Sequence, residues 1–153
     1  MITNVINFCE INMLKDIFLE AKKLRHHRYP AHVLVVEDDD LTRRIVVGAL
    51  GEDNAMITGE NAKDAIGSYL LHAPDIVFLD IGLPDMDGLS VLDQIIAVDP
   101  DAYIVMLSSH NDMQTVNRAY DAGAKGFVSK PFKKEDLQAY IRSSATYHHK
   151  SCM

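Results

Sequence analysis

The residues best suited to chemistry in this chain of 153 residues stand directly after short apolar runs that have the character of β-strands. They are carboxylates, hydroxyls and an ammonium group: Glu37, Asp38 and Asp39 after the first run, Asp80 after the third, Ser108 and Ser109 after the fourth, and Lys130 after the fifth. In an open sheet of parallel strands, ligands bind beyond the carboxyl ends of the strands. We therefore expect these side chains to meet at one end of the sheet.

Such a group of side chains has a definite electrostatic character. Three carboxylates brought together repel by several kcal/mol at an effective dielectric of about 20, so they need a cation or take up protons. Oxygen ligands alone favour a hard divalent ion, and a few carboxylates with water suit Mg²⁺ better than Ca²⁺. The Lys130 ammonium can pair with Asp80 and with an incoming anion, and the Ser108 hydroxyl can add a hydrogen bond.

Each of these residues also has an ordinary structural interpretation. Asp39 or Asp40 could cap a helix, and Asp80 could begin a turn. Ser108 could likewise be an N-cap, and Lys130 could be a surface lysine. These interpretations do not explain why all of them occupy corresponding strand ends.

The elements that would position these residues alternate regularly from His32 onward. The β-branched runs cover residues 33–36, 55–58, 76–79, 103–107 and 127–129, and their continuous apolarity indicates strands buried on both faces. Helical spacing appears between them, for example in Leu41, Ile45, Val46 and Ala49. Asn61 is expected to cap the second of these helices, and Asp99-Pro100 to end the third. The sequence predicts an α/β fold with five β/α units between about 32 and 147, each with a right-handed crossover.

The first 30 residues precede this alternation and contain one amphipathic helical pattern. Its apolar stripe consists of Ile11, Leu14, Ile17, Phe18, Ala21 and Leu24. Tyr29-Pro30 is expected to end the helix, because the residue before a proline is pushed out of helical geometry. A helix this short is marginal alone and must be covered. We expect self-association, with packing on the same domain or on a partner protein as alternatives.

Composition describes one acidic domain, with 15 Lys and Arg against 22 Asp and Glu and a formal net charge of -7. Apart from a basic run at 22–28, it lacks the clustered cations that phosphate backbones require, so nucleic acid is not an expected partner. Cys9 and Cys152 are too far apart for the spacing of a zinc site. Without a long apolar run or a signal-peptide pattern, we expect a cytoplasmic protein with no membrane partner.

Four motifs in this order resemble the CheY-like receiver domain of two-component response regulators. They are Leu34-Val-Val-Glu37-Asp38, Asp80-Ile-Gly-Leu-Pro84-Asp85-Met-Asp87-Gly88, Met106-Leu-Ser108-Ser109 and Lys130-Pro131-Phe132. The resemblance covers about residues 32–147 and implies a doubly wound, flavodoxin-like parallel sheet of order 2-1-3-4-5 with five flanking helices. The expected division is an N-terminal helical extension (1–30), a receiver domain (31–148) and a tail (149–153).

The resemblance also implies a role for each site residue. Asp80 is the phosphoacceptor, and Glu37 and Asp38 are the acidic Mg²⁺ ligands, joined by the backbone carbonyl of Gly82. The further roles concern switching: Ser108 is the switch hydroxyl, Lys130 contacts the phosphate, and its peptide bond to Pro131 is typically cis in the family. Phe127 is the switch aromatic, where many members have tyrosine. Asp80 would attack a phosphohistidine of a sensor histidine kinase or phosphotransfer protein.

The function implied is that of a single-domain response regulator, a phosphoacceptor rather than an enzyme, although it takes part in its own phosphoryl transfer and dephosphorylation. Since Met153 closely follows the last expected helix, output would pass through the face formed by residues of about 112–147. One alternative is an aspartyl-phosphate hydrolase of the haloacid dehalogenase type, but Gly82 stands where that class has its second aspartate. Another is an oligomerising or inhibitory subunit that acts through the N-terminal helix.

Overall fold

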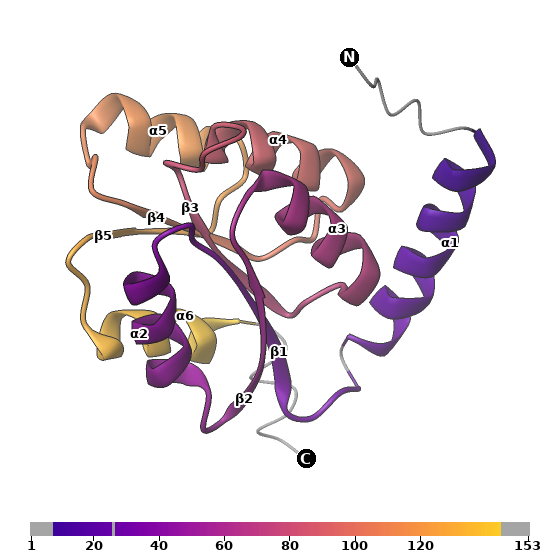
Figure 1. Ribbon diagram of the computed structural model, residues 1–153, viewed down its shortest axis with the longest axis horizontal. Coiled ribbons are helices and arrows are strands. Elements are labelled where there is room, and N and C mark those ends of the chain that lie inside the picture. Colours follow the sequence, from indigo (N-terminus) through magenta and orange to yellow (C-terminus); the bar gives the residue numbers. More distant parts are fainter. Residues whose placement is uncertain (1–7, 26, 145–153) are drawn as a thin grey trace.

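Five parallel strands form the centre of the molecule (Figure 1). The computed structural model describes residues 8–25 and 27–144, and in helix α1 it describes side chains from Asn12 onward. The strands are β1 (Ala31–Val36), β2 (Asn54–Gly59), β3 (Ile76–Asp80), β4 (Ile104–Ser108) and β5 (Gly126–Ser129). Their order is β2-β1-β3-β4-β5, and every neighbouring pair is parallel. This confirms the predicted fold class and strand order.

Helices cover both faces of the sheet, and an additional helix lies at the N-terminus. They are α1 (Phe8–Leu24), α2 (Asp40–Leu50), α3 (Ala62–His72), α4 (Gly88–Val98), α5 (Met113–Asp121) and α6 (Lys134–Ser143). Helices α2 and α6 share one core with β-strand side chains such as Val33 and Val35. Helices α3, α4 and α5 share the other core with Leu34 and Val36. Successive side chains of β1 therefore point alternately into the two cores, which is why the sequence of this strand is apolar throughout.

Several helices begin or end at residues that the sequence predicts as caps or terminators. The Asn61 side chain accepts a hydrogen bond from the Asp64 N–H at 2.8 Å and caps α3 as predicted. Helix α4 ends at Val98, directly before Asp99. In α2, however, Val46 and Leu50 are buried, whereas Leu41 and Ile45 of the predicted apolar pattern are exposed. A helix lying on a sheet buries a narrow stripe, and these two side chains fall outside it.

The N-terminal helix packs on its own domain, alongside α3 (Figure 1). Phe18 is only 3% exposed, and its ring centroid lies 5.9 Å from that of Tyr69. Phe18 is therefore covered by its own domain, so the expectation of self-association is wrong for this side chain and the alternative of intramolecular packing holds for it. Leu24, also assigned to the stripe, is 59% exposed. The side chain of Ile11 and the predicted tail lie outside the described part of the chain.

Helix α1 ends at Leu24 rather than at Tyr29, and Arg25 and Arg28, which follow it, turn toward the domain. The Asp99 carboxylate is buried and receives hydrogen bonds from Arg25 Nη1 at 2.8 Å, the Tyr69 hydroxyl at 2.5 Å and Lys22 Nζ at 2.9 Å. Burial alone would raise the pKa of Asp99, but these donors outweigh it and lower the pKa to about 2. Arg28 adds hydrogen bonds to the carbonyl oxygens that end α3. The basic run at 22–28 thus fastens α1 to the domain.

Candidate functional site

The carboxyl ends of the strands place the predicted site residues together. Asp80 and Ser108 are the last residues of β3 and β4, while Glu37 and Lys130 directly follow β1 and β5. In register, Asp80 lies opposite Leu107 of β4, and Ser108 lies opposite Ser129 of β5. The parallel ladder thus brings side chains from four strands to one end of the sheet, as the sequence predicts.

Three carboxylates form the centre of this site. Glu37, Asp38 and Asp80 each offer an oxygen, and these oxygens all lie within 4.8 Å of one another. Glu37 is only 1% exposed and Asp80 is also buried, whereas Asp38 is exposed at the mouth of the cluster. Burial raises the pKa of Glu37, and the neighbouring charge of Asp80 raises it further. The cluster therefore carries the electrostatic strain that a cation relieves.

Lys130 supplies part of the compensating charge. Its Nζ lies 2.8 Å from Glu37 Oε2 and 3.2 Å from Asp80 Oδ1, so it bridges the two buried carboxylates. Burial alone would lower the pKa of Lys130, but the hydrogen bond to Glu37 and the charge of Asp80 outweigh burial and raise it. Lys130 is thus a site residue and not the surface lysine of the alternative interpretation.

The donor set fits a small divalent cation. When ionised, three carboxylates and one ammonium group leave two negative charges at the site. All the anionic ligands are oxygens, and the exposed Asp38 lies on the side of the cluster that is open to water. Hard oxygen ligands with room for water are the coordination that Mg²⁺ prefers.

The segment after β3 is held in place from both ends. The Gly82 N–H donates to Asp80 Oδ1 at 3.2 Å, and Asp87 caps α4 by accepting from the Leu89 N–H at 2.9 Å. A Cβ atom at Gly88 would stand 2.2 Å from the Asp80 carbonyl oxygen, so only glycine fits this close approach. The local sequence after Asp80 therefore fixes the backbone beside the carboxylates.

Two further site residues were not singled out from the sequence for these contacts. Asp85 accepts hydrogen bonds from the N–H groups of Ala62 and Lys63 at 2.8 and 3.1 Å, which ties the segment after β3 to the start of α3. Arg43 Nη1 donates to the Glu37 carbonyl oxygen at 2.9 Å. Asp85 lies within the motif after Asp80, but its partners are more than 20 positions away, so no local pattern predicts these contacts. For Arg43, the sequence indicates only that it lies in the helix after the first strand.

The switch residues predicted by resemblance lie on β4 and β5 and at the end of β5. Ser108 is buried, and its Oγ accepts a hydrogen bond from the His110 N–H at 2.8 Å. Ser108 is not a helix cap, because Asp112 caps α5 by accepting from the Thr115 N–H at 3.0 Å. Phe127 is half-buried against the core under α3, α4 and α5. The Lys130–Pro131 peptide bond is cis, as the resemblance implies.

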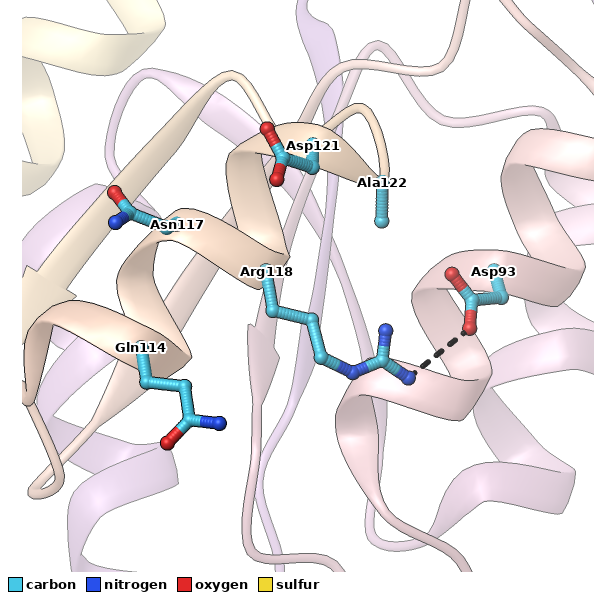
Figure 2. A pocket seen from close by; sticks show the side chains of 6 residues that line it. All are labelled: Asp93, Gln114, Asn117, Arg118, Asp121 and Ala122. Atoms are coloured by element: carbon cyan, nitrogen blue, oxygen red, sulfur yellow. Dashed lines mark hydrogen bonds and ion pairs between the residues drawn. The ribbon is translucent and has the colours of Figure 1, made fainter.

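A separate hollow of about 560 Å³ lies between α4 and α5 (Figure 2). Five of its six lining residues carry polar side chains: the lining consists of Asp93, Gln114, Asn117, Arg118, Asp121 and Ala122. Figure 2 shows Arg118 extending from α5 toward Asp93 of α4, where the two side chains form an ion pair at 3.4 Å. The hollow flanks the α5 part of the predicted output face, whose positions beyond 144 lie outside the described residues.

Comparison with known proteins adds an independent line of evidence. The family model of the response regulator receiver domain matches residues 33–142. The chain is 34% identical over 117 residues to the chemotaxis protein CheY of Bacillus subtilis, covering 74% of this chain and 98% of that protein. It is 35% identical over 111 residues to the transcriptional regulatory protein KdpE of Staphylococcus aureus, covering 72% of this chain but 48% of that protein.

Solved structures give the same result. The crystal structure of the CheX-CheY-BeF3-Mg²⁺ complex from Borrelia burgdorferi matches with a TM-score of 0.71 and 31% identity, covering 74% of this chain and 88% of that one. The match to the family model begins after α1, at residue 33. Among the described helices, none has the length and apolarity needed to cross a membrane.

Proposed function

The chain belongs to the response regulator receiver domain family, and from this we propose that Asp80 accepts a phosphoryl group from a phosphohistidine of a sensor kinase or phosphotransfer protein. Domains of this family are signalling domains and not classical enzymes. One observation carries the assignment to Asp80: its buried carboxylate lies at a strand end with Glu37, Asp38 and the Lys130 ammonium around it. The cytoplasmic location expected from the sequence is part of this proposal.

In the proposed transfer, an Asp80 carboxylate oxygen attacks the phosphorus atom in line. The new oxygen–phosphorus bond forms as the bond to the histidine nitrogen breaks, and the electron pair of that bond returns to the imidazole. Lys130, already 3.2 Å from Asp80 Oδ1, pairs with the transferred phosphoryl oxygens. Glu37 and Arg43 hold the end of β1 in place around this centre.

Mg²⁺ would be held by Glu37, Asp38, Asp80 and the backbone carbonyl of Gly82. When bound, it supplies positive charge against the phosphoryl oxygens and so lets a dianion approach three carboxylates. The fixed backbone between Asp80 and Gly88 keeps Gly82 beside the carboxylates. The solved CheX-CheY-BeF3-Mg²⁺ complex supports this ligand class for a relative of this chain.

The proposed switch begins at Ser108. Its hydroxyl accepts the His110 N–H at 2.8 Å and is expected to turn toward the phosphoryl group once Asp80 is modified. Phe127, half-buried on the neighbouring strand, would then change its packing. The change is read by a protein partner on the surface of α5, β5 and α6, beside the hollow between α4 and α5.

Labelling of the full chain by radiolabelled acetyl phosphate tests the proposal without a cognate kinase. We expect label to appear with Mg²⁺, to be lost in excess chelator, and to be released by hydroxylamine, which cleaves acyl phosphates. Label that survives hydroxylamine, or that forms equally well in chelator, contradicts an Mg²⁺-dependent aspartyl phosphate.

A further inference from the structure

In the structure, the apolar side chains of α1 form two stripes: one packs on the domain, and the other is left exposed. The first stripe, which contains Phe18 and Ala21, packs on the core shared by α3 and α4. The second stripe consists of Met13, Ile17 and Leu24, and the steps of four and seven residues between them place all three on one side of a helix. Met13 is 56% exposed and Leu24 is 59% exposed, with Ile17 half-buried between them.

We propose that this stripe is a homodimer interface in which α1 pairs antiparallel with α1 of a second copy. A twofold axis level with the point between Phe18 and Leu19 sets Met13 of one copy opposite Leu24 of the other, because these two residues are equally far from that point. The same axis sets Ile17 opposite Glu20 of the other copy, so Ile17 lies near the middle of the seam. Each contact occurs twice, as a twofold interface requires.

The charges beside the stripe favour a second copy over an unrelated partner. Asp16, Glu20 and Lys23 are exposed on the flank of the stripe that faces away from the domain. In one copy, Lys23 bonds Glu20 of its own helix at 2.8 Å. In the antiparallel pair, Lys23 also comes near Asp16 of the other copy, so it lies between that carboxylate and Glu20 of its own helix. The two Glu20 side chains approach each other across the axis, and each keeps the Lys23 of its own helix as a counter-charge. A uniformly charged partner would meet like charge at one of these positions.

The anchoring of α1 makes the surface suitable for association. Arg25 and Lys22 fix the helix to the buried Asp99 carboxylate, so the stripe is displayed on a packed element. A preorganised helix loses less conformational freedom on binding than an unattached one.

Sedimentation of the full chain at tens of micromolar tests the proposal. We expect wild type to sediment as a dimer and Leu24→Asp to sediment as a monomer, with a dissociation constant raised at least tenfold. Ile45→Asp is the matched control, since Ile45 is 53% exposed on α2, on the other side of the sheet, and this variant should remain a dimer. Normal acetyl phosphate labelling in all three shows that each is folded.

Cysteine pairing tests the antiparallel geometry. In a background with Cys9→Ser and Cys152→Ser, the double variant Met13→Cys/Leu24→Cys should form an intermolecular disulfide under mild oxidation. The single variants Met13→Cys and Leu24→Cys should not, because the residue opposite the new cysteine in the other copy is then not a cysteine. A monomeric wild type, an unchanged mass for Leu24→Asp, or equal crosslinking by a single variant overturns the proposal. None of these outcomes bears on Asp80 as the phosphoacceptor.

Discussion

At the scale of single residues, Lys130 holds together two buried carboxylates that would otherwise repel. In Lys130→Met, Glu37 and Asp80 lose their shared cation, so we expect the free energy of unfolding in chelator to fall by roughly 1–3 kcal/mol. Mg²⁺ should then stabilise the variant more than it stabilises wild type, because the site has gained negative charge. Urea unfolding with and without Mg²⁺ measures both effects.

Lys125→Met is the control for this prediction, because Lys125 is an exposed lysine just before β5. It should change stability by less than about 0.5 kcal/mol and leave the Mg²⁺ response as in wild type. Equal effects of the two substitutions would mean that the Lys130 bridge has no special energetic role.

Ser108 and Ser109 offer a second comparison at single-residue scale. Ser108 is buried beside Asp80, whereas Ser109 is exposed. Ser108→Ala should still be labelled on Asp80 but should lose the phosphorylation-dependent shifts of Phe127 and β5 amide signals in NMR spectra. Ser109→Ala should keep those shifts. A normal response in Ser108→Ala would remove the hydroxyl from the switch.

At the scale of elements, the segment from β3 to α4 depends on a glycine with no room for a side chain. In Gly88→Ala, the new methyl group would meet the Asp80 carbonyl oxygen at 2.2 Å, and backbone cannot yield as a flexible side chain can. We expect a loss of about 2–4 kcal/mol in unfolding free energy together with weaker Mg²⁺ binding.

Gly48 provides the opposite expectation within the same chain. It lies inside α2, and a Cβ there has nothing within 4 Å. Gly48→Ala should therefore stabilise the protein by about 0.5–1 kcal/mol through better helix propensity. If both substitutions shifted the thermal midpoint in the same direction, the packing argument for Gly88 would be wrong.

The attachment of α1 predicts a specific dependence of stability on pH. The folded pKa of Asp99 is about 2, below the value of about 3.9 for an unfolded chain. A depressed carboxyl pKa stabilises the fold above the unfolded pKa, and this stability is lost as pH falls through the folded pKa. Asp99 should thus contribute on the order of 2 kcal/mol at neutral pH, and this contribution should decline between about pH 5 and pH 2.

Urea unfolding at a series of pH values checks this, with Asp99→Asn and Asp101→Asn compared to wild type. Asp101 also contacts Lys22 but is mostly exposed, so Asp101→Asn should match the wild-type profile. Asp99→Asn should lower stability at neutral pH and flatten the decline in acid. A wild-type profile that is flat from pH 5 to pH 2 would show that the Asp99 network does not stabilise the fold.

The sequence predicts some elements better than others, and the reason is the range of their contacts. The five strands and the convergence of Glu37, Asp80 and Lys130 follow from local apolar runs and from the geometry of parallel sheets. The docking of α1 does not, because it depends on Asp99, more than 70 positions from Arg25. The sequence shows Asp99 only as a helix terminator, and no local pattern links it to the basic run.

At the scale of the whole molecule, α1 leaves the proposed signalling surfaces free. It packs beside α3, while the Asp80 site opens at the carboxyl ends of the strands and the proposed output surface lies on α5, β5 and α6. The α1 attachment through Asp99 is at the end of α4 remote from Gly88 and the site. The α1 attachment and the proposed phosphorylation site therefore occupy separate parts of the molecule, and substitutions in one should leave the other intact.

The most direct test of the account is the labelling of Asp80→Asn by radiolabelled acetyl phosphate with Mg²⁺. The control is Asp53→Asn, an exposed residue in the turn before β2, at the other end of the sheet from the site. We predict that Asp80→Asn takes up no label while Asp53→Asn is labelled as fully as wild type, with both variants folded by circular dichroism. Full labelling of a folded Asp80→Asn protein would contradict the assignment of Asp80 as the phosphoacceptor.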